Sequence, residues 1–301
     1  MKKQLLSLLM LAGIATALTG CQAATPATPT TVATFDSAGT PIRYAIAGEG
    51  EALILLHGWM GEASTWGPGT RDKPVLRAPA GLRVIALDLR GHGLSGKPHE
   101  ASAYGAEMAR DVLRLMDHLQ IKRAHLLGYS MGAFVAGKVV DLAPERVSSV
   151  IYGGSAPVLS TRKVKGFALA DAFDQAVQAN DMGSYVLASI PEGTPKPTPA
   201  QAAEIAKSMY AGQDLKALAA CGRGFANLEV DAARLGTLAV PTLLIYGGSE
   251  SRFVLDRMAE AQAVLPRAEV KVIEGANHVT ALRSPQFSSG VVEFVQRHRG
   301  R

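Results

Sequence analysis

A serine between two glycines is the residue of this chain best suited to act as a nucleophile. Gly128-Tyr129-Ser130-Met131-Gly132 has G-x-S-x-G spacing, follows the apolar run 124–127 and precedes a run of helical character. Strand, sharp turn and helix in this order lift a serine hydroxyl into a cleft, and the glycines permit a turn that a Cβ would crowd. The N-terminus of the helix would direct free N–H groups towards an oxyanion. The pattern therefore predicts nucleophilic acyl chemistry at Ser130.

The elements that must position this serine are short apolar runs alternating with segments of helical period. Strands are expected over 40–47, 52–56, 83–87, 124–127, 147–152, 242–246 and 269–273. Short runs that are apolar throughout are typical of strands buried on both faces. Between the runs at 83–87 and 124–127, one helical apolar stripe is formed by Met108, Val112, Leu115, Met116 and Leu119. This alternation predicts a mostly parallel sheet flanked by helices.

Residues 156–235 interrupt the alternation, because they are rich in alanine and contain no strand-like run. A helix is expected around 168–179. Thr198-Pro199-Ala200-Gln201 resembles a capping box with proline at the first helical position, which predicts a second helix through Met209. We interpret 156–235 as a helical insertion.

With these features the chain resembles an α/β-hydrolase that carries a helical cap, over most of residues 35–298. The G-x-S-x-G elbow and the position of the insertion carry the resemblance. It implies an α/β fold with a mostly parallel sheet of the eight-stranded type, built from 35–155 and 236–298. Residues 156–235 would be the cap.

The resemblance also implies the partners of Ser130, in the order serine, acid, histidine. His278, in the loop after the last strand-like run, corresponds to the late histidine of the family and would be the base. Glu250 follows Gly247-Gly248-Ser249 and occupies the acid position, where the family commonly has aspartate. Two alternatives stay open: Glu250 pairs instead with Arg252, or Asp256 is the acid.

The oxyanion hole implied by the resemblance consists of two backbone amides, those of Met131 and Trp59. His57 is expected to brace the loop that contains Trp59. The stretch 88–95, Asp-Leu-Arg-Gly-His-Gly-Leu-Ser, resembles a family signature, and we interpret Asp88, Arg90 and His92 as mainly structural.

The motifs of other chemistries do not occur in the sequence. It has no H-E-x-x-H, C-x-x-C or paired-carboxylate cluster, and no G-x-G-x-x-G follows a strand-like run. We therefore expect no metal and no cofactor. A serine at the elbow, where relatives that displace halide or open epoxides have aspartate, favours hydrolysis of a small ester, lactone or thioester. The alternatives are a cofactor-free haloperoxidase or perhydrolase, and a non-catalytic binding protein.

The N-terminus resembles the signal of a bacterial lipoprotein. Two lysines precede an apolar stretch over 5–18, and Leu18-Thr19-Gly20-Cys21 resembles a lipobox. We expect a signal peptide over 1–20, lipidation of Cys21 and a flexible tether over 21–34. Gln22 favours the outer membrane, facing the periplasm. The alternative is an ordinary signal peptide with an incidental cysteine.

Charge and cysteine count limit the remaining possibilities. The formal charge is +5, and removal of Lys2 and Lys3 with the signal would leave about +3, too small an excess to indicate nucleic-acid binding. The two cysteines are Cys21 and Cys221, so lipidation of the first would exclude an intramolecular disulfide. Cys221 is then either a buried cap residue or a free thiol. About 265 residues remain, enough for one large domain.

Overall fold

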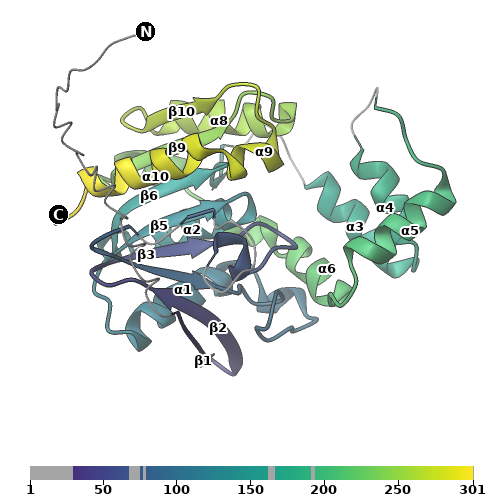
Figure 1. The fold of residues 1–301 in the computed structure, drawn as a ribbon, viewed down its shortest axis with the longest axis horizontal. Helices are drawn as coiled ribbons and strands as arrows, with labels where there is room; N and C mark the ends of the chain where they lie inside the picture. Colours follow the sequence, from purple (N-terminus) through teal and green to yellow (C-terminus); the bar gives the residue numbers. More distant parts are fainter. Residues whose placement is uncertain (1–29, 68–74, 77–78, 162–166, 191–193, 301) are drawn as a thin grey trace, which may run out of the picture.

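The computed structural model describes residues 30–67, 75–76, 79–161, 167–190 and 194–300. Their centre is an eight-stranded sheet with the order β1-β2-β4-β3-β5-β6-β9-β10, in which all neighbours from β4 to β10 run parallel (Figure 1). The strands are β1 (Thr31–Ser37), β2 (Thr40–Ala47), β3 (Glu51–Leu56), β4 (Leu82–Leu87), β5 (Ala124–Tyr129), β6 (Val147–Gly153), β9 (Thr242–Gly247) and β10 (Glu269–Ile273). The predicted parallel sheet is confirmed, and each predicted strand corresponds to a strand of the structure.

The strand β1 corrects the expected boundary of the tether. Residues 31–34, assigned from sequence to the tether, form the first half of β1 and pair antiparallel with 43–46 of β2. The β-branched Thr31, Val32 and Thr34 suit an extended strand, and pairing satisfies their backbone groups. The composition of 31–34 is typical of a linker, but pairing with β2 makes the segment a strand. That pairing cannot be predicted from a local sequence pattern.

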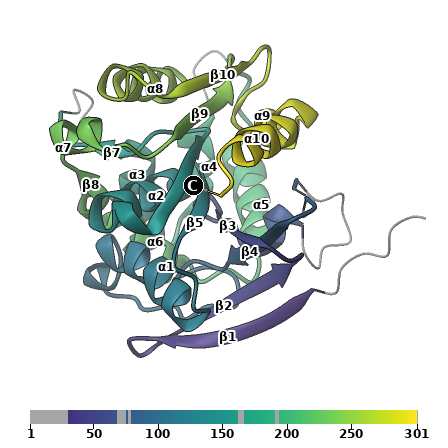
Figure 2. The same ribbon diagram turned by 90° about the vertical axis from the view of Figure 1, so that its left-hand side faces the viewer.

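Helices cover both faces of the sheet (Figure 2). One face is covered by α1 (Ala106–His118), α2 (Met131–Leu142) and α8 (Arg252–Val264), and the other by α10 (Pro285–Arg297) with the 3₁₀ helix η1 (Ala63–Trp66). The short helix α9 (His278–Arg283) lies beside α10. Four residues of the predicted stripe on α1, from Met108 to Met116, are fully buried. Two hydrophobic cores therefore enclose the sheet.

A group of helices, here called the cap helices, stands apart from the sheet at the right of Figure 1. They are α3 (Ala168–Gln178), α4 (Met182–Ser189), α5 (Pro199–Met209) and α6 (Leu215–Arg223), followed by the 3₁₀ helix η4 (Phe225–Leu228). The two-residue strands β7 (Val158–Leu159) and β8 (Glu229–Val230) pair at their base, and α7 (Ala232–Thr237) returns the chain to the sheet.

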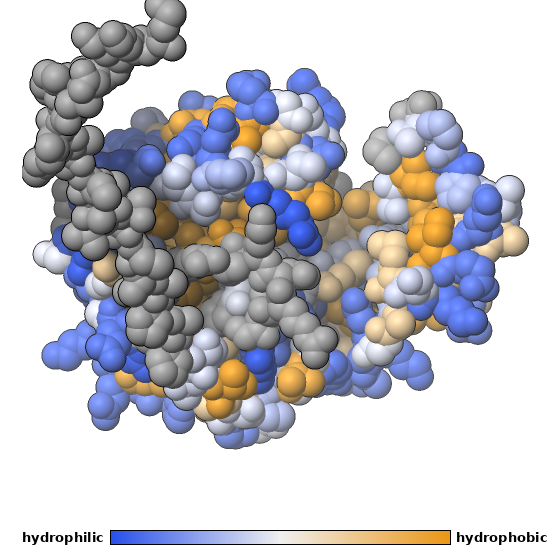
Figure 3. All heavy atoms as spheres, in the orientation of Figure 1, coloured by the Kyte–Doolittle hydropathy of each residue, from blue (hydrophilic) through white to orange (hydrophobic). Residues whose placement is uncertain are grey.

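The cap helices have a small core of their own around Phe173, Tyr185 and Tyr210. The capping box that opens α5 is present, because the Thr198 hydroxyl accepts from the Gln201 amide at 3.3 Å and Gln201 Oε1 accepts from the Thr198 amide at 2.9 Å. Orange apolar surface is visible on these helices in Figure 3, and the exposed apolar residues there include Ile205 and Met209. Within the described ranges, no helix combines the length and apolar character needed to cross a membrane.

Candidate active site

Ser130 sits on a strained turn between β5 and α2. Its φ of 56° and ψ of −118° put a residue with a side chain into a conformation that glycine usually occupies. The two glycines of the motif are required by contact distances. A Cβ on Gly128 would lie 2.1 Å from the Gly132 carbonyl oxygen, and a Cβ on Gly132 would lie 2.1 Å from the Leu56 carbonyl oxygen. The turn therefore depends on the absence of side chains on both sides of Ser130.

The structure brings His278 and Glu250 together. Glu250 follows β9, and His278 follows β10 as the first residue of α9. The imidazole Nδ1 lies 3.0 and 3.1 Å from the two carboxylate oxygens. The Glu250 side chain is 1% exposed and that of His278 40% exposed. Since Nδ1–H donates to the carboxylate, Nε2 is left as the basic nitrogen.

The alternative roles considered for the neighbouring charges do not fit this geometry. Arg252 pairs with Asp256 at 2.8 Å, one helical turn along α8, rather than with Glu250. The Arg252 side chain is 86% exposed, which is typical of a solvated ion pair. The carboxylate that contacts the imidazole is therefore Glu250, and Asp256 is engaged elsewhere.

Tyr129 connects the elbow to the loop of His278. Its hydroxyl donates to the His278 carbonyl at 2.5 Å, and the two rings lie 5.2 Å apart between centroids. Burial, and secondarily the charge of Glu250, raises the pKa of Tyr129, which keeps the hydroxyl protonated as a donor. Within the described part of the chain, no hydrogen bond joins Ser130 Oγ to the His278 ring. Such a contact is often long before substrate binds.

The loop after β3 holds the second candidate amide of the oxyanion hole. His57 Nε2 accepts from the Leu89 amide at 3.0 Å, so Nδ1 carries the proton and donates to the Gly58 carbonyl at 2.8 Å. Burial lowers the pKa of His57, which favours this neutral ring. His57 thus braces the loop, as the sequence predicted. Among the described residues, neither the Trp59 nor the Met131 amide has a hydrogen-bond acceptor.

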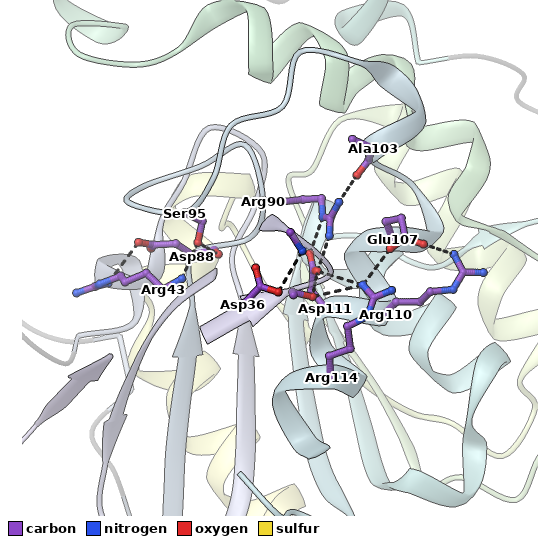
Figure 4. A network of polar contacts seen from close by, with 12 residues as sticks. Asp36, Arg43, Asp88, Arg90, Ser95, Ala103, Glu107, Arg110, Asp111 and Arg114 are labelled. Atoms are coloured by element: carbon purple, nitrogen blue, oxygen red, sulfur yellow. Dashed lines mark hydrogen bonds and ion pairs between the residues drawn. The ribbon is translucent and has the colours of Figure 1, made fainter. Parts of the chain in front are cut away.

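The residues after β4 belong to a network of polar contacts that reaches β2 and α1 (Figure 4). Asp88 accepts from the Ala63 amide at 2.6 Å and the Leu94 amide at 2.9 Å. Arg90 donates two hydrogen bonds of 2.6 Å to Asp111 on α1, and a third to the Ala103 carbonyl. Burial raises the pKa of Asp111, and the hydrogen bonds from Arg90 oppose that shift. The loop is held as a structural unit, as its sequence interpretation expected.

His92 completes this network as a neutral ring. Its Nδ1 lies 3.0 Å from the Arg90 carbonyl, to which it donates. Burial, and secondarily the nearby His57, lowers its pKa to about 3. In the ranges that the structure describes, no group of three His, Cys, Asp or Glu side chains could hold a metal ion.

An apolar cavity of about 380 Å³ opens beside Ser130. Its lining comes from the elbow, the loop after β3, the cap helices and α8: Trp59, Ser130, Met131, Phe134, Phe167, Ala168, Leu169, Ala170, Phe225, Ser251 and Phe253. Cys221 lies beyond this lining as a free, buried thiol, with its sulfur 3.7 Å from that of Met131. Burial raises the pKa of that thiol, so it is an unreactive packing group.

Sequence reasoning missed three features of the site. Tyr129 occupies a variable position of the elbow motif, so nothing in the pattern singled it out. The aromatic walls of the cavity come from five segments far apart in sequence, and hydrophobic periodicity does not indicate which of them meet. The side chain of Trp59 was not assigned a role, although tryptophan is rare in this chain.

The family model described as the α/β-hydrolase fold matches residues 51–180. The dihydrolipoyllysine-residue acetyltransferase component of the acetoin cleaving system from Cupriavidus necator is 30% identical, over 88% of this chain and 68% of that protein. The corresponding Pseudomonas putida component is also 30% identical, with 66% of its length covered. This chain thus spans about two thirds of these relatives. Pimeloyl-[acyl-carrier protein] methyl ester esterase from Aliivibrio fischeri is 26% identical, over 86% of this chain and 99% of that protein.

Solved structures of similar shape cover nearly the whole described chain. A protein described as an aryl esterase from Burkholderia cenocepacia superposes with a TM-score of 0.67 at 24% identity, over 90% of this chain and all of the other. The bromoperoxidase from Bacillus anthracis gives the same TM-score at 22% identity, over 89% of this chain and 99% of that one. At such identities the likeness concerns the fold.

Proposed function

The chain belongs to the α/β-hydrolase fold family, and we propose that it is a serine hydrolase that cleaves a small carboxylic ester, lactone or thioester. The observation that carries the proposal is the contact of His278 with the buried Glu250 at 3.0 Å, at the same edge of the sheet as the strained Ser130. An exposed imidazole backed by a buried carboxylate is suited to accept and return a proton. The methyl ester esterase among the relatives also supports hydrolysis of an ester.

In the proposed reaction, Ser130 Oγ attacks the carbonyl carbon while His278 Nε2 takes its proton. Glu250 holds the imidazole through Nδ1 and stabilises the imidazolium that forms. The carbonyl oxygen becomes an oxyanion that accepts from the amides of Trp59 and Met131. Collapse breaks the bond to the alcohol or thiol, which leaves with the proton from His278. Water then attacks the acyl-enzyme, with His278 again as the base, and releases the acid.

The cavity beside Ser130 favours an apolar acyl group of modest size. Its volume of about 380 Å³ lies at the lower end of the range of about 300–1,000 Å³ that is typical of small-molecule sites. Aromatic rings form much of its wall, and the cap helices contribute part of the lining. We propose a small-molecule acyl substrate rather than a peptide, because a cavity of this volume suits a small molecule.

We also propose that the mature protein is anchored to a membrane by lipid on Cys21, in the periplasm at the outer membrane. Residues 1–29, with the signal and Cys21, lie outside the described residues. From Cys21 to the start of β1 at Thr31 the chain can extend about 36 Å at most. We expect Cys21→Ala to move the protein from the membrane fraction to the soluble fraction. Unchanged membrane association, with no incorporation of labelled palmitate, would contradict the anchor.

The test of the hydrolase proposal is hydrolysis of p-nitrophenyl esters of increasing acyl length by Ser130→Ala and His278→Ala. We expect either change to lower kcat/KM by at least about 10³-fold, because the two groups act as a unit. Unfolding free energies should stay within about 1 kcal/mol of the wild type, since neither side chain is fully buried. Ser289→Ala, at an exposed position of α10, is the matched control and should retain activity.

Two further measurements separate the alternatives. A fluorophosphonate probe should label the wild type and not Ser130→Ala. Near-native turnover by either variant would refute the assignment, and a wild type that neither labels nor turns over any ester would favour a binding protein. Oxidation of halide by peroxide that depends on a carboxylic acid would instead indicate a perhydrolase.

A further inference from the structure

Trp59 lies where two hydrophobic cores of the molecule meet. It packs against the core that α1, α2 and α8 form with the sheet, and also against the core inside the cap helices. Of the partly buried apolar residues in the described ranges, it alone packs against both. Its backbone belongs to the loop after β3, beside Ser130, while its side chain extends into the cap. The residue therefore connects the two parts at the proposed active site.

The indole is held by three separate elements of the cap. Its Nε1–H donates to the Leu218 carbonyl of α6 at 3.2 Å. Its ring packs edge-to-face against Phe173 of α3, at 5.0 Å and 65°, and against Phe225 of η4, at 5.4 Å and 79°. Gly222 of α6 lies next to the ring, because a Cβ there would lie 3.2 Å from Cζ2 of the indole. A directional bond and ring packing of this kind fix the side chain relative to the cap.

The peptide group between Gly58 and Trp59 is held from the other side by the loop after β3. Its carbonyl oxygen accepts from His57 Nδ1 at 2.8 Å and from the Gly61 amide at 3.0 Å. The N–H of the same planar group points away from that oxygen and has no acceptor among the described residues. Met60, which follows, has a φ of 66°, a strained conformation for a residue with a side chain. The direction of the N–H thus depends on the contacts of the Gly58 carbonyl at one end and on the packing of the indole at the other.

We propose that the indole of Trp59 is a positioning group that links the placement of the cap helices to one donor of the oxyanion hole. The inference rests on the proposed function. When the cap is seated, the indole holds the Trp59 amide towards the space above Ser130. When the cap is displaced, the indole moves with it and the amide loses its direction. The acylation rate would then depend on the cap, beyond any part that the cap has in holding the substrate.

The direct test is a substitution in the cap that adds a methyl group next to the indole and leaves the loop after β3 unchanged. Gly222→Ala adds a methyl group that would lie 3.2 Å from Cζ2 of the indole and 3.1 Å from Cβ of Ala170 on α3. Gly183→Ala is the matched control, because its added Cβ meets Ala203 of α5 at 3.1 Å, inside the cap and away from Trp59. Trp59→Phe provides a second variant, which keeps an aromatic ring and removes the hydrogen bond to Leu218. Thermal unfolding of each variant is measured to check that it is folded.

We expect Gly222→Ala and Trp59→Phe to lower kcat for p-nitrophenyl esters about tenfold or more, with KM changed by less than about threefold. Complete loss of an oxyanion donor costs about 10²–10³ in rate, so a misdirected donor should cost somewhat less. Affinity for an alkylboronic acid, which mimics the tetrahedral intermediate on Ser130, should fall by a similar factor. Gly183→Ala should change neither quantity by more than about twofold.

Other outcomes overturn the link in distinguishable ways. If KM rises and kcat does not fall, the indole only forms the wall of the cavity. If both variants retain kcat and boronate affinity while the wild type is active, the link is wrong and the proposed hydrolase stands. If the wild type neither turns over esters nor reacts with a fluorophosphonate, the hydrolase falls, and the link falls with it.

Discussion

Two carboxylates at the carboxyl edge of the sheet are equally buried but have different partners. Asp88, after β4, and Glu250, after β9, each have a side chain that is 1% exposed. Asp88 is satisfied mainly by two backbone amides, that of Ala63 in η1 and that of Leu94 in its own loop, and the nearby His92 is fully enclosed and neutral. Glu250 faces an imidazole that is 40% exposed. A buried carboxylate bonded to amides builds a loop, whereas one bonded to a half-exposed histidine leaves a ring able to exchange protons.

The comparison of Asp88 with Glu250 predicts the largest effect on kcat for a substitution of Glu250. Glu250→Gln keeps the shape of the side chain but removes the charge that stabilises the imidazolium, and it can favour the wrong tautomer of His278. We expect kcat for ester hydrolysis to fall by about 10²–10⁴-fold. Asp256→Asn should change kcat by less than about twofold, because Asp256 pairs with Arg252. A large loss in Asp256→Asn with little in Glu250→Gln would reverse the assignment of the acid.

The next effect concerns the free energy of unfolding, to which the buried Arg90–Asp111 pair contributes. Asp111→Asn leaves the Arg90 guanidinium buried without its carboxylate, which should lower the free energy of unfolding by about 3–5 kcal/mol. Glu107→Gln is the control one turn earlier on α1, since its pairs with Arg110 and Arg114 are partly exposed and should contribute less than about 1 kcal/mol. Urea unfolding measures both. Equal losses in the two variants would show that burial of the Arg90–Asp111 pair is not what distinguishes it.

A smaller effect is the pH dependence that comes from His92. Its folded-state pKa of about 3 lies below the ordinary value of 6.5. Between these values the unfolded chain binds the additional proton, so the free energy of unfolding rises with pH and levels off above about pH 6.5. From pH 7 to 5.5, His92 should account for a loss of about 1 kcal/mol.

The matching variant is His92→Asn, whose amide can replace Nδ1–H as a donor. It should be less stable than the wild type at pH 7 because it leaves a cavity. Its loss between pH 7 and 5.5, however, should be smaller by about 1 kcal/mol. Parallel pH profiles for the two proteins in urea unfolding would mean that His92 is already protonated, or solvated, in the folded state.

The features predictable from sequence are those that a short segment specifies by itself. The parallel strands, the stripe on α1, the elbow and the capping box of α5 each depend on residues within one turn or one run. The strand β1 was not among the predicted strands, because its residues become a strand only through pairing with β2. The choice between Glu250 and Asp256 was open for a related reason. They lie six positions apart, and only the placement of β10 and α9 decides which one contacts His278.

The aromatic cavity and the role of the Trp59 side chain could not be predicted from the sequence. Phe134, Phe167, Phe225 and Phe253 are spread over more than a hundred residues, and each would read as an ordinary core residue in its own segment. Trp59 was identified only through its backbone. That its indole reaches α6, 159 positions along the chain, follows from tertiary packing that no periodicity encodes.

The collisions that Gly128 and Gly132 avoid have a consequence for redesign. The bend between β5 and α2 is dictated by the two positions that bear no side chain, and the residue between them inherits its backbone angles from that frame. The backbone of this turn therefore does not depend on which reactive side chain occupies position 130. A cysteine or an aspartate at that position should keep the same backbone angles and the same direction of the side chain, so the nucleophile can be exchanged without loss of the turn.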